Sequence, residues 1–333
     1  MKVMLMKKPA VALALLALGA AATVLSPGAA RAQEQYPSKP LKFVVPFSPG
    51  GGIDILARTI GQKLGDEWKT AVVVDNRPGA SGNIGTEVVA KSPADGYTVL
   101  TTANTIIMAP TLYKKVGFDP VKDFAPVAPL AIGSLALVAR PTLNVKTVKD
   151  FIALAQANPG KFNYGSPGNG TPHHLAMELV KQKANIDVTH IPYKGSAGLV
   201  TDVVSGQVDI AFLPVHQVLP YVKSGKMLML AAGGTKRTSV TPDVPSLAQA
   251  SGIGDVVVDM WYGLYLPAGA PKEVVAKLNR AVNAILKQPD VGVTLGNLGL
   301  QPSGGSPEQL AELTVSDLNR WAKVIKQAKI AAD

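Results

Sequence analysis

The sequence predicts an α/β fold in which parallel strands are covered by helices. Along most of the chain, short apolar runs alternate with segments whose apolar residues recur every three or four positions. That alternation is typical of strands joined by helical crossovers. The chain has 333 residues, which is enough for two domains, and we find no fixed-period repeat and no low-complexity linker in it.

The strands are predicted from the apolar runs, which lie at residues 41–45, 72–74, 98–101, 135–138, 163–164, 208–212 and 227–231. The first helix is predicted from a stripe that would form one buried face, made by Ile53, Leu56, Ile60 and Leu64. Further helices are expected at residues 147–157, 172–183, 197–205, 271–287 and 306–330. Ser306 and Pro307 indicate the start of the last one, as a capping serine followed by proline at the first helical position.

The chain begins with a segment that we expect to be removed. Basic residues precede an apolar stretch at residues 9–24, and Ala30-Arg31-Ala32 offers the small residues that a signal peptidase needs. We therefore expect residues 1–32 to be a signal peptide, cleaved before Gln33, and the product to be periplasmic. An uncleaved membrane anchor is the alternative. A lipoprotein anchor needs a cysteine, and the sequence contains none.

The net charge of +10 is spread along the chain in short runs, with few aromatic residues between them. Nucleic-acid binding is therefore not expected. The charge fits a solvated surface, and it is also compatible with small anionic partners.

The segment PFSPGGGIDILAR places three glycines, Gly50 to Gly52, between a predicted strand and a predicted helix. Glycine lets a ligand approach the backbone, and a helix N-terminus carries unpaired N–H groups and about half a positive charge. The loop is thus either an anion site or an ordinary tight turn. Asp54 lies in the first helical turn. Three roles stay open for it: a surface residue that stabilises the helix, a residue that contacts a ligand, or a residue that orients the loop.

A second segment, residues 163–175, repeats the order of strand, glycine-rich loop and helix, with Thr171 as the expected N-cap. Two such loops are able to hold one ligand from opposite sides. A third loop, residues 76–85, has glycines that do not fit the dinucleotide-binding spacing, and it is either another anion site or a support for the first loop.

The sequence shows no local motif of a serine hydrolase, zinc protease or P-loop enzyme, so we expect no catalytic residues. A triad assembled in space stays open. His173 and His174 are adjacent and would point to different sides of a helix, which makes them a poor metal pair. We expect His174 to be packed or capping and His173 to reach a cleft. His216 follows the end of a predicted strand, where it lines a pocket or, as we expect, lies in a surface loop. No metal or cofactor is expected.

Five segments in order resemble the extracytoplasmic substrate-binding receptors of tripartite tricarboxylate transporters, also called Bug receptors. They are PFSPGGGIDILAR, VVVDNRPGASGNIGTEVVAKSPADGYTVL, YGSPGNGTPHHLAMEL, IPYKGSAGLVTDVVSGQVDIAF and MWYGLYLPAGAP. The resemblance implies a type II periplasmic binding protein, with two α/β lobes, each a central sheet flanked by helices, joined by two crossing strands. We expect lobe I at residues 33–137 plus 260–333 and lobe II at 138–259, with crossings near residues 138–141 and 259–262.

The resemblance also implies the ligand-binding positions. They are Phe47, Ser48, Gly50, Gly51, Gly52 and Asp54 in the first lobe, Ser166, Gly168, Asn169, Gly170 and Thr171 in the second, and Asn104, Tyr193 and Pro214 as weaker candidates. His173 and His216 are expected to contact the distal end of the ligand.

The resulting expectation is a monomeric, non-enzymatic receptor. It would capture a small organic carboxylate by hinge closure and deliver it to the membrane permease subunits of a tripartite tricarboxylate-type transporter. An exported hydrolase and a ligand-sensing receptor for a signalling partner are the alternatives. Backbone donors recognise a carboxylate but leave the rest of the ligand undetermined.

Overall fold

A computed structural model describes Met1 and residues 36–234, 237, 241–254, 256, 259–327 and 330. Apart from Met1, the predicted signal peptide at residues 1–32 lies outside the described residues. Residues Lys39–Asp333 form one compact unit, to which all of the following refers. Within the described ranges, none of the helices combines the length and the apolar character needed to cross a membrane.

Two mixed sheets form the framework of this unit. The first sheet has the strand order β11-β4-β10-β3-β1-β2. Its strands are β1 (Leu41–Val45), β2 (Val72–Asn76), β3 (Thr98–Ala103), β4 (Phe124–Gly133), β10 (Met260–Pro267) and β11 (Leu300–Pro302). β1 runs parallel to β2 and β3, whereas β10 is antiparallel to both β3 and β4. The predicted parallel arrangement therefore holds for the part of the sheet that carries the first glycine-rich loop.

The second sheet has the order β7-β6-β8-β5-β9. Its strands are β5 (Leu135–Ala139), β6 (Asn163–Ser166), β7 (Thr189–Pro192), β8 (Ile210–Pro214) and β9 (Leu228–Ala232). β6 runs parallel to β7 and β8, and β5 is antiparallel to its neighbours β8 and β9. We refer to the first sheet with its helices as the first lobe, and to the second sheet with its helices as the second lobe.

The chain passes from the first sheet to the second at Ser134, the single residue between β4 and β5. The predicted crossing at residues 138–141 was wrong, because Val138 and Ala139 are paired inside β5. Gly133 and Ser134 stand at the junction, but apolar residues continue on both sides of them as one strand follows the other, so the sequence does not mark the change of sheet. The chain returns to the first sheet between helix α8 (Leu247–Ser251) and β10, close to the predicted second crossing.

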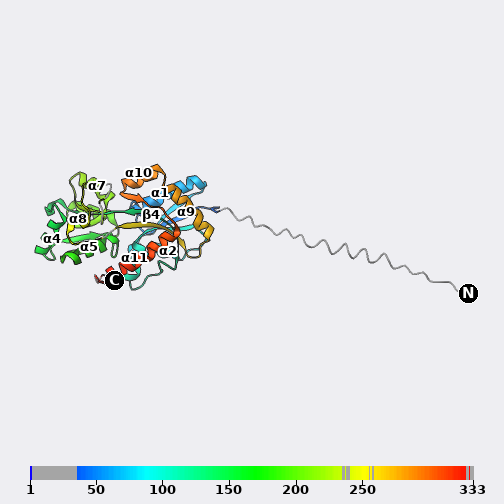
Figure 1. Cartoon of the computed structure of the whole chain (residues 1–333), viewed down its shortest axis with the longest axis horizontal. Coiled ribbons are helices and arrows are strands. Elements are labelled where there is room, and N and C mark those ends of the chain that lie inside the picture. Colours follow the sequence, from blue (N-terminus) through cyan, green and yellow to red (C-terminus); the bar gives the residue numbers. More distant parts are fainter. Residues whose placement is uncertain are drawn as a thin grey trace. The chain divides into compact units, whose positions relative to one another are not determined.

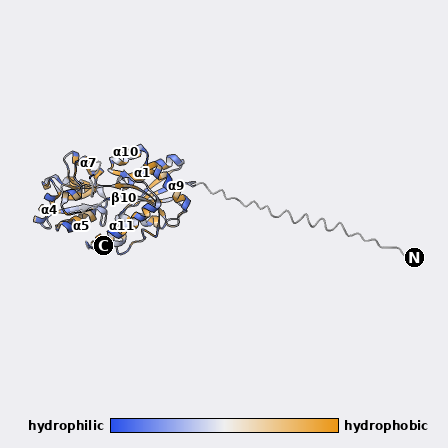
Figure 2. Ribbon diagram, in the orientation of Figure 1, coloured by the Kyte–Doolittle hydropathy of each residue, from blue (hydrophilic) through white to orange (hydrophobic). Residues whose placement is uncertain are grey.

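Helices cover the faces of both sheets. In the first lobe they are α1 (Gly52–Trp68), α2 (Asn83–Ala90), α3 (Thr105–Leu112), α9 (Lys272–Leu286), α10 (Pro289–Asn297) and α11 (Pro307–Gln327). In the second lobe they are α4 (Val148–Ala157), α5 (Pro172–Ala184), α6 (Ser196–Ser205), α7 (Val215–Lys223) and α8. Figure 1 shows α1, α9 and α10 on one side of the first lobe, with α2 and α11 on the other. Figure 2 shows apolar residues, in orange, along strands such as β10, and hydrophilic residues towards the outer ends of the helices.

Local sequence signals explain several helix boundaries. The stripe predicted for α1 is buried against the sheet. α11 begins as expected, because Ser306 Oγ accepts from the backbone N–H of Gln309, and Gln309 Oε1 accepts from the N–H of Ser306. α5 has Thr171 at the predicted N-cap, followed by Pro172.

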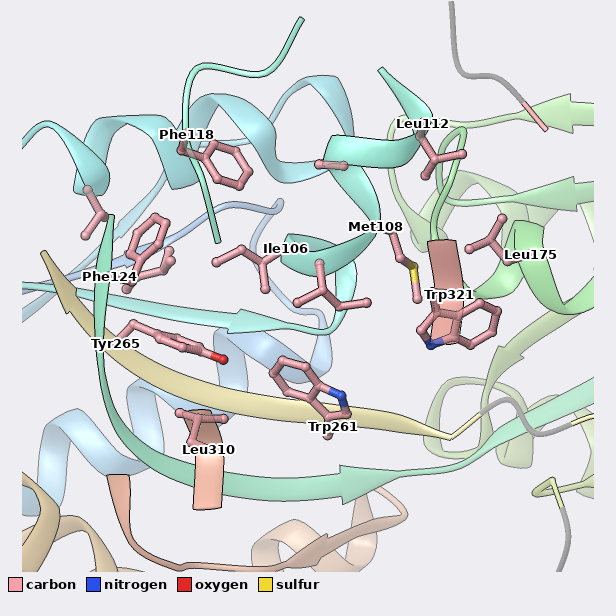
Figure 3. Close-up of a cluster of buried hydrophobic side chains, with 14 of the residues drawn as sticks. Ile106, Met108, Leu112, Phe118, Phe124, Leu175, Trp261, Tyr265, Leu310 and Trp321 are labelled. Atoms are coloured by element: carbon pink, nitrogen blue, oxygen red, sulfur yellow. The ribbon is translucent and has the colours of Figure 1, made fainter. Parts of the chain in front are cut away.

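A hydrophobic cluster joins the two lobes at the side of α3 (Figure 3). Met108 and Leu112 from α3 and Trp321 from α11 pack with Leu175, which comes from α5 of the second lobe. Trp261 of β10 belongs to the same cluster, and its indole N–H donates to Asp317 Oδ2 of α11 at 2.7 Å. α11 is therefore attached to the strand that returns the chain from the second sheet.

We expect Asp317→Ala to lower the free energy of unfolding by roughly 2 kcal/mol, because it leaves the buried indole N–H of Trp261 without an acceptor. Chemical denaturation of both proteins measures the difference. Glu312→Ala on the same helix is the matched control, since Glu312 is exposed. Equal stability of the two variants would contradict this role of Asp317.

Candidate functional site

A cavity of about 450 Å³ lies where the carboxyl ends of strands from both sheets meet. The first lobe lines it with Phe47 to Asp54, Ala103, Thr105, Met260 and Tyr262. The second lobe lines it with Pro167, Thr171, His173, Tyr193 to Gly198, Pro214 and Gln217. Open α/β sheets place their ligands at this edge.

Five helices begin at the cavity wall. They are α1, α3, α5, α6 and α7, which follow β1, β3, β6, β7 and β8 directly. In none of these five does the N-cap side chain accept a hydrogen bond from the helix. The N-cap side chains thus leave first-turn N–H groups to other acceptors: in α7 the N–H of Val215 donates to the Ser134 carbonyl at 3.3 Å, in α3 the N–H of Ile107 donates to the Asn104 carbonyl at 3.4 Å, and α5 begins with Pro172, which has no N–H. The positive ends of the five helix dipoles converge on one space.

The first glycine-rich loop is held in place by Asp54. Its carboxylate is only 3% exposed and accepts from Gly50 N at 2.9 Å, from Arg58 Nε at 3.0 Å and from Asn76 Nδ2 at 3.0 Å. Burial alone would raise the pKa of Asp54, but these hydrogen bonds and the charge of Arg58 outweigh it and lower the pKa. Asp54 is therefore an ionised support for the loop, and the interpretation as a surface residue was wrong.

The third loop supports the first, which is one of the two alternatives left by the sequence. Besides its bond to Asp54, Asn76 Nδ2 donates to the carbonyl of Phe47 at 3.0 Å. None of residues 76–85 lines the cavity. Ser81 of this loop reaches the second lobe instead, where its Oγ donates to the carbonyl of Asn169 at 2.7 Å.

One part of the second glycine-rich loop lines the cavity, and another part contacts the first lobe. Of its predicted site residues, only Thr171 lines the cavity, whereas Ser166, Gly168, Asn169 and Gly170 do not. The Asn169 carbonyl accepts from Ser81 Oγ and, at 3.4 Å, from Tyr113 OH of the first lobe. Gly170 has a φ of +71°, and a Cβ at this position would collide with Leu112 Cδ1 of α3. A side chain at Gly170 would thus disturb packing between the lobes and would not itself fill the cavity.

A buried polar network fixes the shape of this loop. Ser166 Oγ lies 2.7 Å from His190 Nε2 and accepts from Gly168 N at 3.2 Å. The N–H of Gly170 donates to His174 Nδ1 at 2.9 Å, which confirms the predicted capping role of His174. The rings of His174 and His190 are stacked 4.0 Å apart. Ser166 and His190 make a serine–histidine contact, but Ser166 is buried outside the cavity lining and serves the loop.

His173 lies on the wall of the cavity, as expected, and is 6% exposed. Neither of its ring nitrogens has a hydrogen-bond partner within the described part of the chain. Burial lowers the pKa of His173 to about 3, so the ring is neutral at physiological pH. A neutral imidazole carries one donor and one acceptor, and both nitrogens of His173 are buried in the cavity wall.

The structure places His216 and Asn104 differently from what the sequence predicted. His216 is not in a surface loop but in the first turn of α7, with its Cε1 near Gly52 of the first lobe. Asn104 is fully buried outside the lining, where its Nδ2 donates to the carbonyl of Asp259 at 3.2 Å. Asn104 therefore connects the end of β3 to the segment that returns from the second lobe.

Sequence reasoning missed several lining residues, among them Thr105, Ser196, Gln217, Met260 and Tyr262. Lys194 and Gly195 lie between a strand and a predicted helix, so this segment has the same order of strand, glycine and helix as the two glycine-rich loops. That pattern is the signal that could have identified the start of α6 as part of the site. Gln217 and Tyr262 carry no local signal, because only the packing of the two lobes brings them to one space.

Among the described residues that line the cavity, Asp54 is the only carboxylate and Lys194 the only lysine or arginine. Because Asp54 is paired with Arg58 at 3.0 Å, it adds little negative charge to the cavity. The site is therefore suited to a small anion with an apolar body, which Phe47, Ile53, Met260 and Tyr262 are able to contact.

Residues 56–330 match the family described as Tripartite tricarboxylate transporter family receptor. The chain belongs to this family. The resemblance seen in the five sequence segments is thus confirmed, and the receptor is similar to solved members over most of its length.

Three solved structures share the two-sheet architecture. R. palustris Rpa4515 with adipate is 35% identical, has a TM-score of 0.85, and is matched over 89% of this chain and 99% of that one. The periplasmic binding protein BugD is 30% identical, with a TM-score of 0.83 and coverage of 89% and 99%. MatC from Rhodopseudomonas palustris with bound malate is 30% identical, with a TM-score of 0.81 and coverage of 87% and 100%. The predicted fold, two lobes of the periplasmic binding protein type, is confirmed by these similarities.

We expect the Tm of the receptor to fall as the pH is lowered from about 6.5 to about 4.5. Burial lowers the pKa of His173 to about 3 and of His174 and His190 to about 4, from an ordinary value of 6.5. In this window the unfolded state binds more protons than the folded state, so acidification favours unfolding.

Thermal unfolding across this pH range measures the effect. His174→Gln keeps an acceptor for the Gly170 N–H but cannot titrate, so its Tm should depend less on pH. An unchanged slope would contradict the assignment to these histidines.

Proposed function

We propose that this receptor captures a small organic carboxylate in the cavity between its lobes and presents the closed form to a membrane permease. The observation that carries the proposal is the convergence of five helix N-termini without side-chain caps on one cavity. Helix N-termini bind anions through backbone donors and the helix dipole. A carboxylate satisfies these donors without a charged side chain.

The energies support binding by backbone groups. A hydrogen bond to a charged acceptor is worth about 1.5–3 kcal/mol, and a Kd of about 1 μM corresponds to roughly −8 kcal/mol. Four or five such donors, drawn from the first turns of α1 and α6, reach that value after the cost of ordering the ligand. The adipate and malate in the solved relatives are carboxylates too, which supports the same chemistry here.

Hinge closure is proposed from the route of the chain. The lobes are connected at Ser134 and through residues 252–259, and we assign residues 39–133 plus 260–327 to lobe I and 135–251 to lobe II. A ligand that contacts both lobes favours the closed arrangement by its contacts to each of them. The cavity wall includes residues of both lobes, as this mechanism requires.

The rest of the proposal concerns the cellular role. Residues 1–32 are a signal peptide removed before Gln33, the mature receptor is a periplasmic monomer, and its partner is the permease of a tripartite tricarboxylate-type transporter. Family membership supports transport over signalling as the output. The receptor performs no catalysis. Ser166 Oγ lies 2.7 Å from His190 Nε2, a distance found in serine hydrolases, but Ser166 is fully buried behind the loop.

A thermal-shift screen of residues 33–333 against small carboxylates and their matching amides tests the proposal. The protein is first partly unfolded and refolded to remove carried-over ligand. At 100 times the Kd, a ligand stabilises by about 2.7 kcal/mol, which is easily detected. Stabilisation by carboxylates but not by amides is expected, whereas no response to any carboxylate would contradict the proposal.

Ser196→Pro tests the backbone donors directly. Ser196 is the first residue of α6, where proline is tolerated, so the substitution removes one N–H from the cavity wall while the helix is kept. Carboxylate affinity, measured by calorimetry, should fall at least tenfold. Ser196→Ala retains the N–H and should bind normally; equal affinities of the two variants would show that α6 does not contact the ligand.

A further inference from the structure

Residues 193–198, which we call the rim segment, form one continuous stretch of the cavity wall. They connect the end of β7 to the first turn of α6. A Cβ at Gly195 would meet no atom of the described chain within 4 Å other than its immediate neighbours, and Gly195 offers no side chain to cap the helix. The middle of the rim segment is therefore not held by packing or by capping.

Tyr193, the first residue of the rim segment, is fixed at both ends. Its backbone N–H donates to the carbonyl of Ser166 in β6 at 2.8 Å. Its phenol O–H donates to Asp202 Oδ2 at 2.5 Å, a length typical of a hydrogen bond from a hydroxyl to an ionised carboxylate. Its ring lies beside Gly198, where a Cβ would be 3.5 Å from Tyr193 Cδ1. Tyr193 therefore ties the rim segment to β6 through the main chain and to α6 through the side chain.

The part of α6 that carries Asp202 is held in place by the core of the second lobe. Leu199, Val200 and Val203 are buried, and a Cβ at Gly165 of β6 would collide with Leu199 Cδ1. Asp202 itself lies outside the cavity lining. Its hydrogen bond to Tyr193 spans nine positions in the chain and closes a loop that contains the rim segment. Closing a loop in this way restricts the conformations of the residues inside it.

The hydrogen bonds of Tyr193 favour a role in positioning over direct contact with an anion. Tyrosine has two hydrogen-bond donors, its backbone N–H and its phenol O–H, and in Tyr193 both are in use. Burial, together with the hydrogen bond to Asp202 and the charge of its carboxylate, raises the pKa of Tyr193 to about 12, so the phenol keeps its proton. A carboxylate ligand only accepts hydrogen bonds, and Tyr193 has no further donor to offer it.

We propose that Asp202 is a positioning residue of this receptor. Through Tyr193 it holds the rim segment so that the N–H groups at the start of α6 point towards the bound ligand. This inference rests on the proposed carboxylate-binding function, which assigns the donors of α6 to the ligand. Asp202 thereby influences the affinity from outside the cavity lining.

Hydrogen exchange of the Tyr193 amide, resolved by NMR, tests the positioning without any ligand. Asp202→Ala removes the acceptor of the phenol, so the bond from the Tyr193 N–H to Ser166 should open more often and the amide should exchange about tenfold faster. Asp202→Asn keeps an accepting oxygen and should restore most of the protection. Asp187→Ala, which removes an exposed carboxylate of the same lobe, is the matched control and should exchange like the wild type. Wild-type exchange in Asp202→Ala overturns the inference.

Calorimetry with adipate, malate and benzoate measures the effect on binding. The affinity for each acid that binds should fall about tenfold in Asp202→Ala, which corresponds to about 1.4 kcal/mol, and should stay close to the wild-type value in Asp202→Asn. In a Tyr193→Phe background, Asp202→Ala should cause no further loss, because Asp202 acts through the phenol. An equal loss with and without the phenol overturns the inference.

The contrary outcomes are distinct. If the Tyr193 hydroxyl itself contacted the ligand, Tyr193→Phe would weaken binding and Asp202→Ala would not, which overturns the positioning role. Tyr193→Phe provides a second variant for the exchange measurement in case Asp202→Ala does not fold, and its amide at position 193 should also exchange faster. Failure of all three acids to bind a protein that unfolds cooperatively would count against the proposed function, and the amide exchange, which uses no ligand, would still decide whether Asp202 positions the rim segment.

Discussion

The rest of the structure depends on one constraint: backbone N–H groups at the start of a helix need acceptors. Five helices begin at the same cavity, and none uses its N-cap side chain for that purpose. Both sheets are oriented so that their carboxyl edges face this space. The cavity is therefore formed mainly by the N-terminal ends of helices, and the side chains in its wall determine how polar it is.

Side chains in and behind the cavity wall keep those ends in position. Asp54, Arg58 and Asn76 form a closed set of hydrogen bonds behind the first loop, and Asn76 also holds the Phe47 carbonyl. In the second lobe, Ser166, His174 and His190 do the same for residues 166–170. A negative charge that would repel an anion is thereby converted into a support, because Arg58 neutralises it.

The sequence predicted what is encoded locally. The glycine-rich loops, the apolar stripe of α1, the caps of α5 and α11 and the cavity-lining position of His173 follow from neighbouring residues. The crossing at Ser134 was misplaced because β4 and β5 adjoin without a turn. Gln217 and Tyr262 were missed because they are far apart in the chain and meet only after the lobes pack. Asn169 and Gly170 were predicted to contact the ligand, whereas they contact the first lobe. A glycine-rich sequence permits close approach of a ligand and of another part of the protein equally, so the sequence does not distinguish the two.

The contact at Asn169 has a consequence for the equilibrium between open and closed forms. Ser81 and Tyr113 donate to its carbonyl, and Leu112 packs over Gly170, without any ligand atom between them. These contacts stabilise the arrangement of the two lobes in this structure through protein atoms alone. The apparent Kd is the intrinsic Kd divided by the fraction of receptor that is competent to bind. Residues at this contact therefore set how tightly every ligand is held, while the cavity wall sets which ligand is preferred, so the two properties are able to change independently during evolution.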